Sequence, residues 1–258
     1  MDHDDELVGT MLSRREAIRV AALAGASLVF GPASAQATGQ LHPAKVMNLV
    51  ATSEVEEGPF FVDEELNRSD VTLGTTRGSV VDGSPIAVRL TVYGLRGKHT
   101  EPLRGAHIDI WHADAKGAYS DEASNLIQSE STKGEKWLRG YQVTDGDGRV
   151  EFRTIFPGWY QNRTPHIHVK IRNFDPKANR THVFNTQLFF DEAVNDEMLN
   201  RAPYNDRGAR RVRNLWDGLY AMKQADGTMV GSHLHFSVDK SPAGVVQRAH
   251  FAIGLNLS

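Results

Sequence analysis

Two histidines separated by one residue, His166 and His168, are the first candidates for metal chemistry in this sequence. They lie in a β-branched run at 164–171, and because side chains alternate along a strand, both imidazoles would face the same side. Their attachment points would be about 6.6 Å apart, which allows both rings to reach one ion. A second pair with the same spacing, His233 and His235, shows that this motif alone is weak evidence.

Two tyrosines and an arginine lie near the first pair. Tyr160 ends the turn segment 156–160, and Arg163 lies between it and His166, while Tyr119 follows a predicted strand and a glycine-containing loop. Each tyrosine could equally be a half-buried aromatic residue with a hydrogen-bonded hydroxyl. The chain contains no cysteine, so a metal would be bound through nitrogen and oxygen. Phenolate oxygens suit a hard trivalent ion better than thiolates do.

The overall composition narrows the possible functions. The 258 residues include 29 Lys and Arg against 32 Asp and Glu, a formal net charge of -3, so we do not expect a nucleic-acid partner. A hydrophobic fraction of 40% and a charged fraction of 24% are typical of a globular domain and exclude a disordered or coiled-coil chain.

Residues 1–37 are predicted to be a twin-arginine signal peptide, with the pair Arg14 and Arg15 before an apolar run. That run is 11 residues long, whereas spanning a bilayer takes about 20, so no membrane anchor is expected. Acidic residues before the pair are unusual in such a signal and leave Met11 open as the start. We expect export to the periplasm or beyond, and a single catalytic domain over 38–258.

The pattern of short β-branched or alternating runs predicts an all-β fold, an antiparallel β-sandwich with short helical excursions. The predicted strands cover residues 86–93, 107–113, 149–156, 166–172, 183–190, 229–238 and 245–255. Turn sequences of the kind that closes hairpins occupy 82–85 and 145–148. Helical patterns are confined to 192–200 and 209–222, which we expect at the edge of a sheet.

Long blocks of the chain resemble the intradiol ring-cleavage dioxygenases, which open catechol, protocatechuate and hydroxyquinol. The blocks are EEGPFF at 56–61, DIWHADAKGAYSD at 109–121, LRGYQVTDGDGRVEFRTIFPGWY at 138–160, RTPHIHVKI at 163–171 and TQLFF at 186–190. They follow in order along most of the predicted domain, and they are far more specific than a pair of histidines.

The resemblance implies a non-haem Fe(III) bound by Tyr119, Tyr160, His166 and His168. It also implies that Tyr160 is the ligand that dissociates when substrate binds, while Tyr119 stays. The implied substrates are a small catechol-type diol and O₂, and the implied product is a muconate-type diacid that contains both oxygen atoms.

Two further residues receive roles through the same resemblance. Arg163 is expected to stabilise negative charge that develops on the substrate ring, and Gln187 is expected to help orient the substrate. Without that resemblance, Arg163 would be interpreted as a surface guanidinium paired with an acid, and Gln187 as a strand-face amide. His112 is expected to be a hydrogen-bonded structural residue.

The sequence departs from the family pattern in the loop between Tyr160 and Arg163, where only two residues stand. Relatives have a longer loop there that lines the pocket, so the sequence leaves the diol open, and it leaves the oligomeric state open too. An alternative is a non-catalytic, transthyretin-like β-sandwich that binds ligands in an aromatic groove. A third possibility is a zinc hydrolase, although zinc sites favour histidine and carboxylate over phenolate.

Overall fold

The computed structural model separates the chain into two units, Met1–Leu41 and His42–Ser258, and each stands by itself. The structure describes residues 49–76, 81–124, 128–175, 180–208 and 212–257. All of these lie in the second unit, so the predicted signal peptide at 1–37 falls outside the described residues. Among the residues that are described, no helix has the length and apolar character needed to cross a bilayer.

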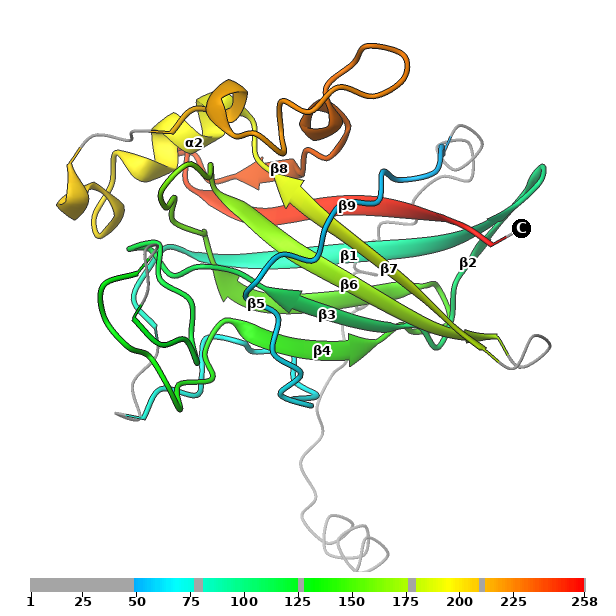
Figure 1. Cartoon of the computed structure of the whole chain (residues 1–258), viewed down its shortest axis with the longest axis horizontal. Helices are drawn as coiled ribbons and strands as arrows, with labels where there is room; N and C mark the ends of the chain where they lie inside the picture. Colours follow the sequence, from blue (N-terminus) through cyan, green and yellow to red (C-terminus); the bar gives the residue numbers. More distant parts are fainter. Residues whose placement is uncertain (1–48, 77–80, 125–127, 176–179, 209–211, 258) are drawn as a thin grey trace, which may run out of the picture. The chain divides into compact units, whose positions relative to one another are not determined.

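A four-stranded antiparallel sheet carries the residues singled out above (Figure 1). Its strands, in spatial order, are β4 (Arg139–Val143), β3 (His107–Trp111), β6 (His166–Asp175) and β7 (Arg180–Phe189). Each neighbouring pair is antiparallel. The two central strands, β3 and β6, therefore have their backbone groups paired on both sides.

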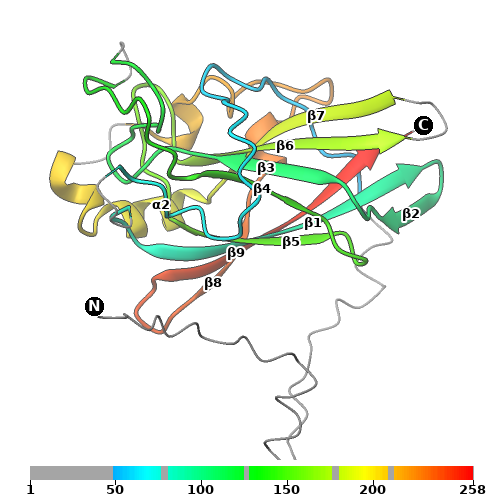
Figure 2. The same ribbon diagram turned by 90° about the horizontal axis from the view of Figure 1, so that it is seen from below.

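The second sheet packs against the first, and Figure 2 shows the two as separate layers. It contains β2 (His99–Pro102), β1 (Pro85–Arg96), β9 (Val246–Asn256) and β8 (Ser237–Lys240), with β5 (Arg149–Ile155) also paired to β1. The β1–β9 pair is parallel, and the other pairs in this sheet are antiparallel. The predicted all-β sandwich is confirmed, with this one parallel pair as a refinement.

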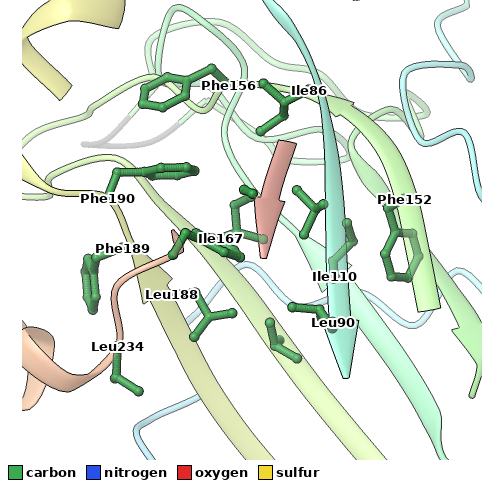
Figure 3. Packing of buried hydrophobic residues seen from close by; sticks show 14 of the residues in the cluster. Ile86, Leu90, Ile110, Phe152, Phe156, Ile167, Leu188, Phe189, Phe190 and Leu234 are labelled. Atoms are coloured by element: carbon green, nitrogen blue, oxygen red, sulfur yellow. The ribbon is translucent and has the colours of Figure 1, made fainter. Parts of the chain in front are cut away.

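The core lies between the sheets and follows the period-two pattern of the strands. On β6, Ile167, Val169 and Ile171 are all fully buried, and Figure 3 shows Ile167 among core residues from both sheets, including Leu90 of β1. Because these residues occupy the inner face, His166 and the other even-numbered positions of β6 must face outward.

The helical regions were predicted only in part. The helix expected at 192–200 is confirmed as α2 (Glu192–Leu199). The helix expected at 209–222 is wrong: in its described part the chain forms a 3₁₀ turn at Asn214–Trp216 followed by turns. The Asp217 carboxylate accepts the backbone N–H groups of Leu219 and Tyr220, which stabilises a turn there instead of helix.

Two other expectations need correction. The predicted strand at 229–238 is wrong over most of its length: it contains a 3₁₀ turn, Val230–His233, and β8 begins only at Ser237. Gly231 packs so closely on the Tyr220 ring that a side chain at this position would overlap the ring. The contact with Tyr220 therefore determines the backbone conformation of this segment. The turn 145–148 does not close a hairpin, because it connects β4 of one sheet to β5 of the other.

An N-terminal segment, 55–60, crosses the outer face of the first sheet, and Figure 1 shows it in blue across the strands. The backbone N–H of Val55 donates to the carbonyl of Asn185 on β7 at 2.9 Å. Further along, the Glu57 carboxylate pairs with Lys170 of β6 at 2.5 Å. The segment therefore covers the outward-facing side chains of the central strands.

Candidate functional site

The two histidines of the first motif lie on the outer face of β6 as predicted, and both are nearly inaccessible to solvent. His166 is 2% and His168 is 1% exposed, while Ile167 between them points into the core. Strand register surrounds His168 with Trp111 on β3 and Gln187 on β7. The Trp111 ring stacks on the His168 ring with centroids 4.7 Å apart, which fixes the imidazole orientation.

Tyr119 is brought to these histidines by the loop that follows β3. Asp114 accepts two backbone N–H groups of that loop through one carboxylate oxygen, at 2.8 and 2.9 Å. Gly117 has φ +82°, and a side chain there would overlap the carbonyl of Trp159. The backbone N–H of Tyr119 donates to the amide oxygen of Gln128 at 2.8 Å. The ring is therefore held in a tightly specified loop.

Tyr160 arrives from the other side, on the loop that follows β5. Gly158 donates its backbone N–H to the carbonyl of Asp114 at 3.0 Å, which joins this loop to the loop of Tyr119. Tyr160 and Arg163 exchange two backbone hydrogen bonds, at 3.3 and 3.0 Å, around Asn162 with φ +64°. The two-residue spacing seen in the sequence is thus a tight turn.

Four polar side-chain atoms converge where these elements meet. The hydroxyl oxygen of Tyr119 lies 3.1 Å from His168 Nε2 and 3.4 Å from His166 Nε2. The Tyr160 hydroxyl lies 3.4 Å from His166 Nε2, and the two Nε2 atoms are 3.1 Å apart. Donors that each lie about 2.0–2.2 Å from one metal ion are themselves about 2.9–3.4 Å apart at ordinary coordination angles. The observed spacing matches that range.

The hydrogen bonding of His166 decides what its inner nitrogen can do. Its Nδ1 lies 2.7 Å from the carbonyl oxygen of Thr164, which can only accept, so Nδ1 carries the proton. In the neutral ring Nε2 then bears a lone pair, directed at His168 and the tyrosine hydroxyls. A carbonyl that fixes the tautomer of a histidine in this way is typical of metal ligands.

Burial controls the charge of all four groups. It lowers the pKa of His166 and His168 well below the usual value of 6.5, so both imidazoles are neutral at physiological pH. It raises the pKa of Tyr119 well above 10 and also raises the pKa of Tyr160, so neither phenol ionises by itself. A bound trivalent cation would supply the missing stabilisation of the phenolates.

Aromatic side chains seal this site. Phe60, from the crossing segment, is 3% exposed and stacks on Tyr119 with ring centroids 4.3 Å apart. It meets the Tyr160 ring edge to face at 6.2 Å. Arg139, itself 2% exposed, donates to the carbonyl of Phe60 and holds the segment in place. The donor atoms are therefore excluded from bulk water, which strengthens electrostatic interactions inside.

Arg163 and Gln187 flank the same site. Arg163 Nη1 donates to the Tyr160 hydroxyl at 3.3 Å, and Nη2 donates to the amide oxygen of Gln187. Gln187 also donates from Nε2 to the carbonyl of Glu56 at 3.1 Å. The third guanidinium nitrogen, Nε, donates to the Asp217 carboxylate at 2.9 Å. The structure therefore brings together all six residues predicted for the site.

His112 directly follows Trp111 in the sequence, but its ring does not contact the four donor atoms. Its Nδ1 donates to the carbonyl of Ala113 at 2.8 Å, and its Nε2 accepts from the Thr154 hydroxyl at 2.6 Å. Both ring nitrogens are satisfied, and burial lowers its pKa to about 4. The prediction of a structural, hydrogen-bonded histidine is confirmed by these contacts.

The second histidine pair does not join the four donors. His233 is exposed and contacts the Thr228 hydroxyl at 3.0 Å. His235 pairs with Asp191 at 2.6 Å and with the Tyr220 hydroxyl at 2.8 Å. In the described part of the chain, no group of three or more His, Asp or Glu side chains is arranged to hold a metal ion. A metal ion bound by His166 and His168 would therefore take its other protein donors from Tyr119 and Tyr160.

Three residues of the site were not assigned from the sequence: Phe60, Arg139 and Asp217. Phe60 and Arg139 fall within the sequence blocks quoted above, so their place in those blocks could have marked them. Asp217 lies 54 residues from its partner Arg163 in a segment predicted to be helical. No local sequence signal connects those two positions.

A family model described as dioxygenase matches residues 56–214. The chain is 32% identical over 142 residues to catechol 1,2-dioxygenase 1 from Acinetobacter lwoffii, covering 46% of this chain and 43% of that protein. It is 29% identical over 156 residues to chlorocatechol 1,2-dioxygenase from Pseudomonas putida, covering 52% of each. The chain thus spans about half the length of these curated relatives.

Comparison with solved structures covers more of the chain than the comparison with curated relatives does. The chain superposes on an intradiol ring-cleavage dioxygenase from Tetranychus urticae with a TM-score of 0.65 and 28% identity. The superposition covers 81% of this chain and 95% of that structure. The chain also matches the dioxygenase domain of a carbohydrate-binding fusion protein from Streptomyces sp. SirexAA-E, with a TM-score of 0.53 and 27% identity, over 81% of this chain and 100% of that one.

Proposed function

Because the chain belongs to the intradiol ring-cleavage dioxygenase family, we propose that it cleaves a catechol-type aromatic diol with O₂. The bond between the two hydroxylated carbons breaks, and both atoms of O₂ enter a muconate-type diacid. One observation carries this proposal: the Nε2 atoms of His166 and His168 and the hydroxyls of Tyr119 and Tyr160 converge within 3.1–3.4 Å contacts in a buried site.

The donor set fits a ferric ion. Two neutral imidazoles and two phenols that can become phenolates give two nitrogen and two anionic oxygen donors, which suit a hard trivalent ion. Two phenolate charges also offset most of the charge of Fe(III), which reduces the cost of burying it. Tyr119, Tyr160, His166 and His168 would hold the ion, and when bound it would supply the Lewis acid that activates the diol toward O₂.

Tyr160 and Tyr119 have different surroundings, which supports different roles. Tyr119 contacts both Nε2 atoms and is stacked under Phe60, so its hydroxyl is fixed. The Tyr160 hydroxyl contacts one imidazole and receives a hydrogen bond from Arg163. Of the two tyrosines, Tyr160 would be the one that gives way to the incoming diol. Its oxygen would take a proton from the diol beside Arg163 Nη1, while Tyr119 would remain with the two imidazoles.

Arg163 and Gln187 act on the substrate. The guanidinium is fixed and largely desolvated beside the Tyr160 hydroxyl, where it stabilises negative charge that develops on the ring during oxygen attack. Gln187 is 0% exposed and lies opposite His168 on the neighbouring strand, so its amide orients the diol. Curated relatives are named for catechol and chlorocatechol, and we propose a diol of that class.

We also propose where in the cell the protein acts. Residues 1–37 would direct export by the twin-arginine route, so the domain would act in the periplasm or outside the cell. The pair Arg14 and Arg15 and the short apolar run after it support this. Replacing both arginines with lysine should retain the protein in the cytoplasm. Unchanged export of that variant, measured by cell fractionation, would contradict the route.

Oxygen uptake by the purified protein tests the proposed activity. With catechol, substituted catechols and trihydroxybenzenes, at least one diol should drive uptake of one O₂ per diol, with formation of a muconate-type acid. The alternative, a transthyretin-like binding module, predicts a colourless and iron-free protein that binds such compounds without consuming oxygen.

A further inference from the structure

Asp217 is a fully buried carboxylate whose side chain is directed at the residues of the site. It is 0% exposed, and its Oδ2 accepts from Arg163 Nε at 2.9 Å and from the backbone N–H of Thr164 at 3.0 Å. Its Oδ1 accepts the backbone N–H groups of Leu219 and Tyr220 at 3.0 and 3.2 Å. Four donors satisfy both oxygens, which is what a buried charge requires.

This contact determines where the Arg163 guanidinium lies. The group is planar, so fixing Nε on Asp217 also fixes the directions of both Nη atoms. Nη1 then donates to the Tyr160 hydroxyl, and Nη2 donates to the amide oxygen of Gln187. The Arg163 side chain is 19% exposed, and an unanchored arginine has many rotamers with which to reach the solvent.

The loop that carries Asp217 is itself tied to the sheet. Asn214 donates to the carbonyl of Phe190 at 2.9 Å, just beyond the end of β7. Its amide oxygen accepts from Asn195 of α2 at 3.0 Å and from the Thr164 hydroxyl at 2.6 Å. The carboxylate is therefore presented to Arg163 from a preorganised support instead of a free loop.

We propose that Asp217 is a positioning residue for ring cleavage: it anchors Arg163 Nε so that the guanidinium stays beside the Tyr160 hydroxyl and Gln187. The inference rests on the proposed function and deepens it, because it names a residue that acts through Arg163 and does not itself contact the metal donors. Positive charge that is misplaced by an ångström stabilises a developing anion much less.

The test uses Asp217→Asn, Arg163→Met and the double variant in the full-length, iron-loaded protein. Asparagine is nearly isosteric and still accepts the Leu219 and Tyr220 N–H groups, but it cannot bind the guanidinium as a carboxylate does. Iron content should stay at the wild-type level. The visible tyrosinate band should shift, because Tyr160 loses its fixed hydrogen bond from Arg163, and kcat should fall roughly ten- to a hundred-fold.

The double variant separates positioning from general damage. If Asp217 acts through Arg163, adding Asp217→Asn to Arg163→Met should not lower kcat further. If Asp217→Asn lowers kcat by the same factor in the wild type and in Arg163→Met, the inference is overturned. A wild-type kcat together with an unshifted tyrosinate band in the Asp217→Asn single variant would also overturn it. Asn195→Ala serves as the control for loosening of the same loop, because it should lower the unfolding temperature without moving the band.

A further readout does not depend on iron or turnover. Arg163→Met leaves the buried Asp217 carboxylate without its ion-pair partner, and Asp217→Asn removes the same ion pair from the other side. Each single variant should therefore lower the unfolding temperature, and the double variant should lower it by less than the sum of the two shifts. Absence of iron and of ring cleavage in the wild type overturns the proposed function, and this role with it. An active wild type with additive unfolding shifts and additive kcat losses overturns this role alone.

Discussion

The Nε2 atoms of His166 and His168 face each other at 3.1 Å, and the Nδ1 proton of His166 is committed to the carbonyl of Thr164. The lone pair on His166 Nε2 is thus directed at a second buried, neutral imidazole. Burial disfavours a second proton, and therefore a charged imidazolium, on either ring. A neutral His168 with its proton on Nε2 would donate to this lone pair, whereas a metal ion bound between the rings would take the Nε2 lone pair of both.

Replacing either His166 or His168 with alanine should therefore remove most of the bound iron. Loss of one of four donors should lower metal affinity by at least about 10–100-fold, the loss typical even of residues that only support the ligands. Iron content after purification and dialysis measures this. His233→Ala is the matched control, since that exposed histidine lies in the other pair with the same spacing, and it should retain iron.

Tyr119→Phe and Tyr160→Phe should change the visible absorption of the iron-loaded protein. Each variant removes one phenolate donor, so the tyrosinate-to-iron charge-transfer band should weaken or move. Tyr119 contacts both imidazoles, so its loss should also lower iron content more than the loss of Tyr160. Tyr141→Phe is the control, because Tyr141 is half-buried against the His107 ring and is not one of the donors, so the spectrum should stay unchanged. If Tyr119→Phe or Tyr160→Phe leaves the charge-transfer band unchanged, that tyrosine is not an iron donor.

Gly158→Ala should destabilise the fold and weaken iron binding together. A Cβ at this position would overlap the carbonyl of Asp114 and lie 2.6 Å from that of Ala115, where the two tyrosine loops meet. We expect a loss of about 3 kcal/mol in unfolding free energy, measured by urea denaturation. Gly146→Ala is the control, because no atom lies within 4 Å of the position that its added methyl group would take. Its effect should stay within about 0.5 kcal/mol.

The buried His112 should make stability depend on pH. Its folded-state pKa is about 4 against an ordinary value of 6.5, so the unfolded chain binds the proton first as pH falls. The stabilisation is complete above about pH 6.5 and is lost as pH falls toward 4, by about 3 kcal/mol for this group. The advantage of the wild type over His112→Gln in urea unfolding should shrink by that amount over this window. An advantage that is independent of pH would contradict the low pKa.

The sequence predicted the layers of the fold because strand signals are local. The alternation at Ile167, Val169 and Ile171 identified the inner face of β6, and the outward direction of His166 and His168 followed from it. The short strands β2 and β4 were not predicted. β4 contains Gly140 and lies at the edge of its sheet, where pairing with β3 supplies what local propensity does not.

The site was predictable where its residues lie in contiguous blocks and was not predictable elsewhere. Tyr119, Tyr160 and the two histidines stand in such blocks, although only the folded loops show that their donor atoms meet. Asp217 was missed because its partner lies 54 residues away and because its carboxylate stabilises a turn where the pattern favoured helix. Long-range pairing of this kind leaves no periodic signal in a single sequence.

Titration of Fe(III) into the metal-free protein, followed by visible absorption, tests the four-donor centre most directly. We expect saturation at one ion per chain with a tyrosinate charge-transfer band, and no such band when Tyr119 and Tyr160 are both replaced with phenylalanine. Saturable ferric binding without any visible band, or a purified protein that holds one zinc per chain and no iron, would contradict the four-donor ferric centre.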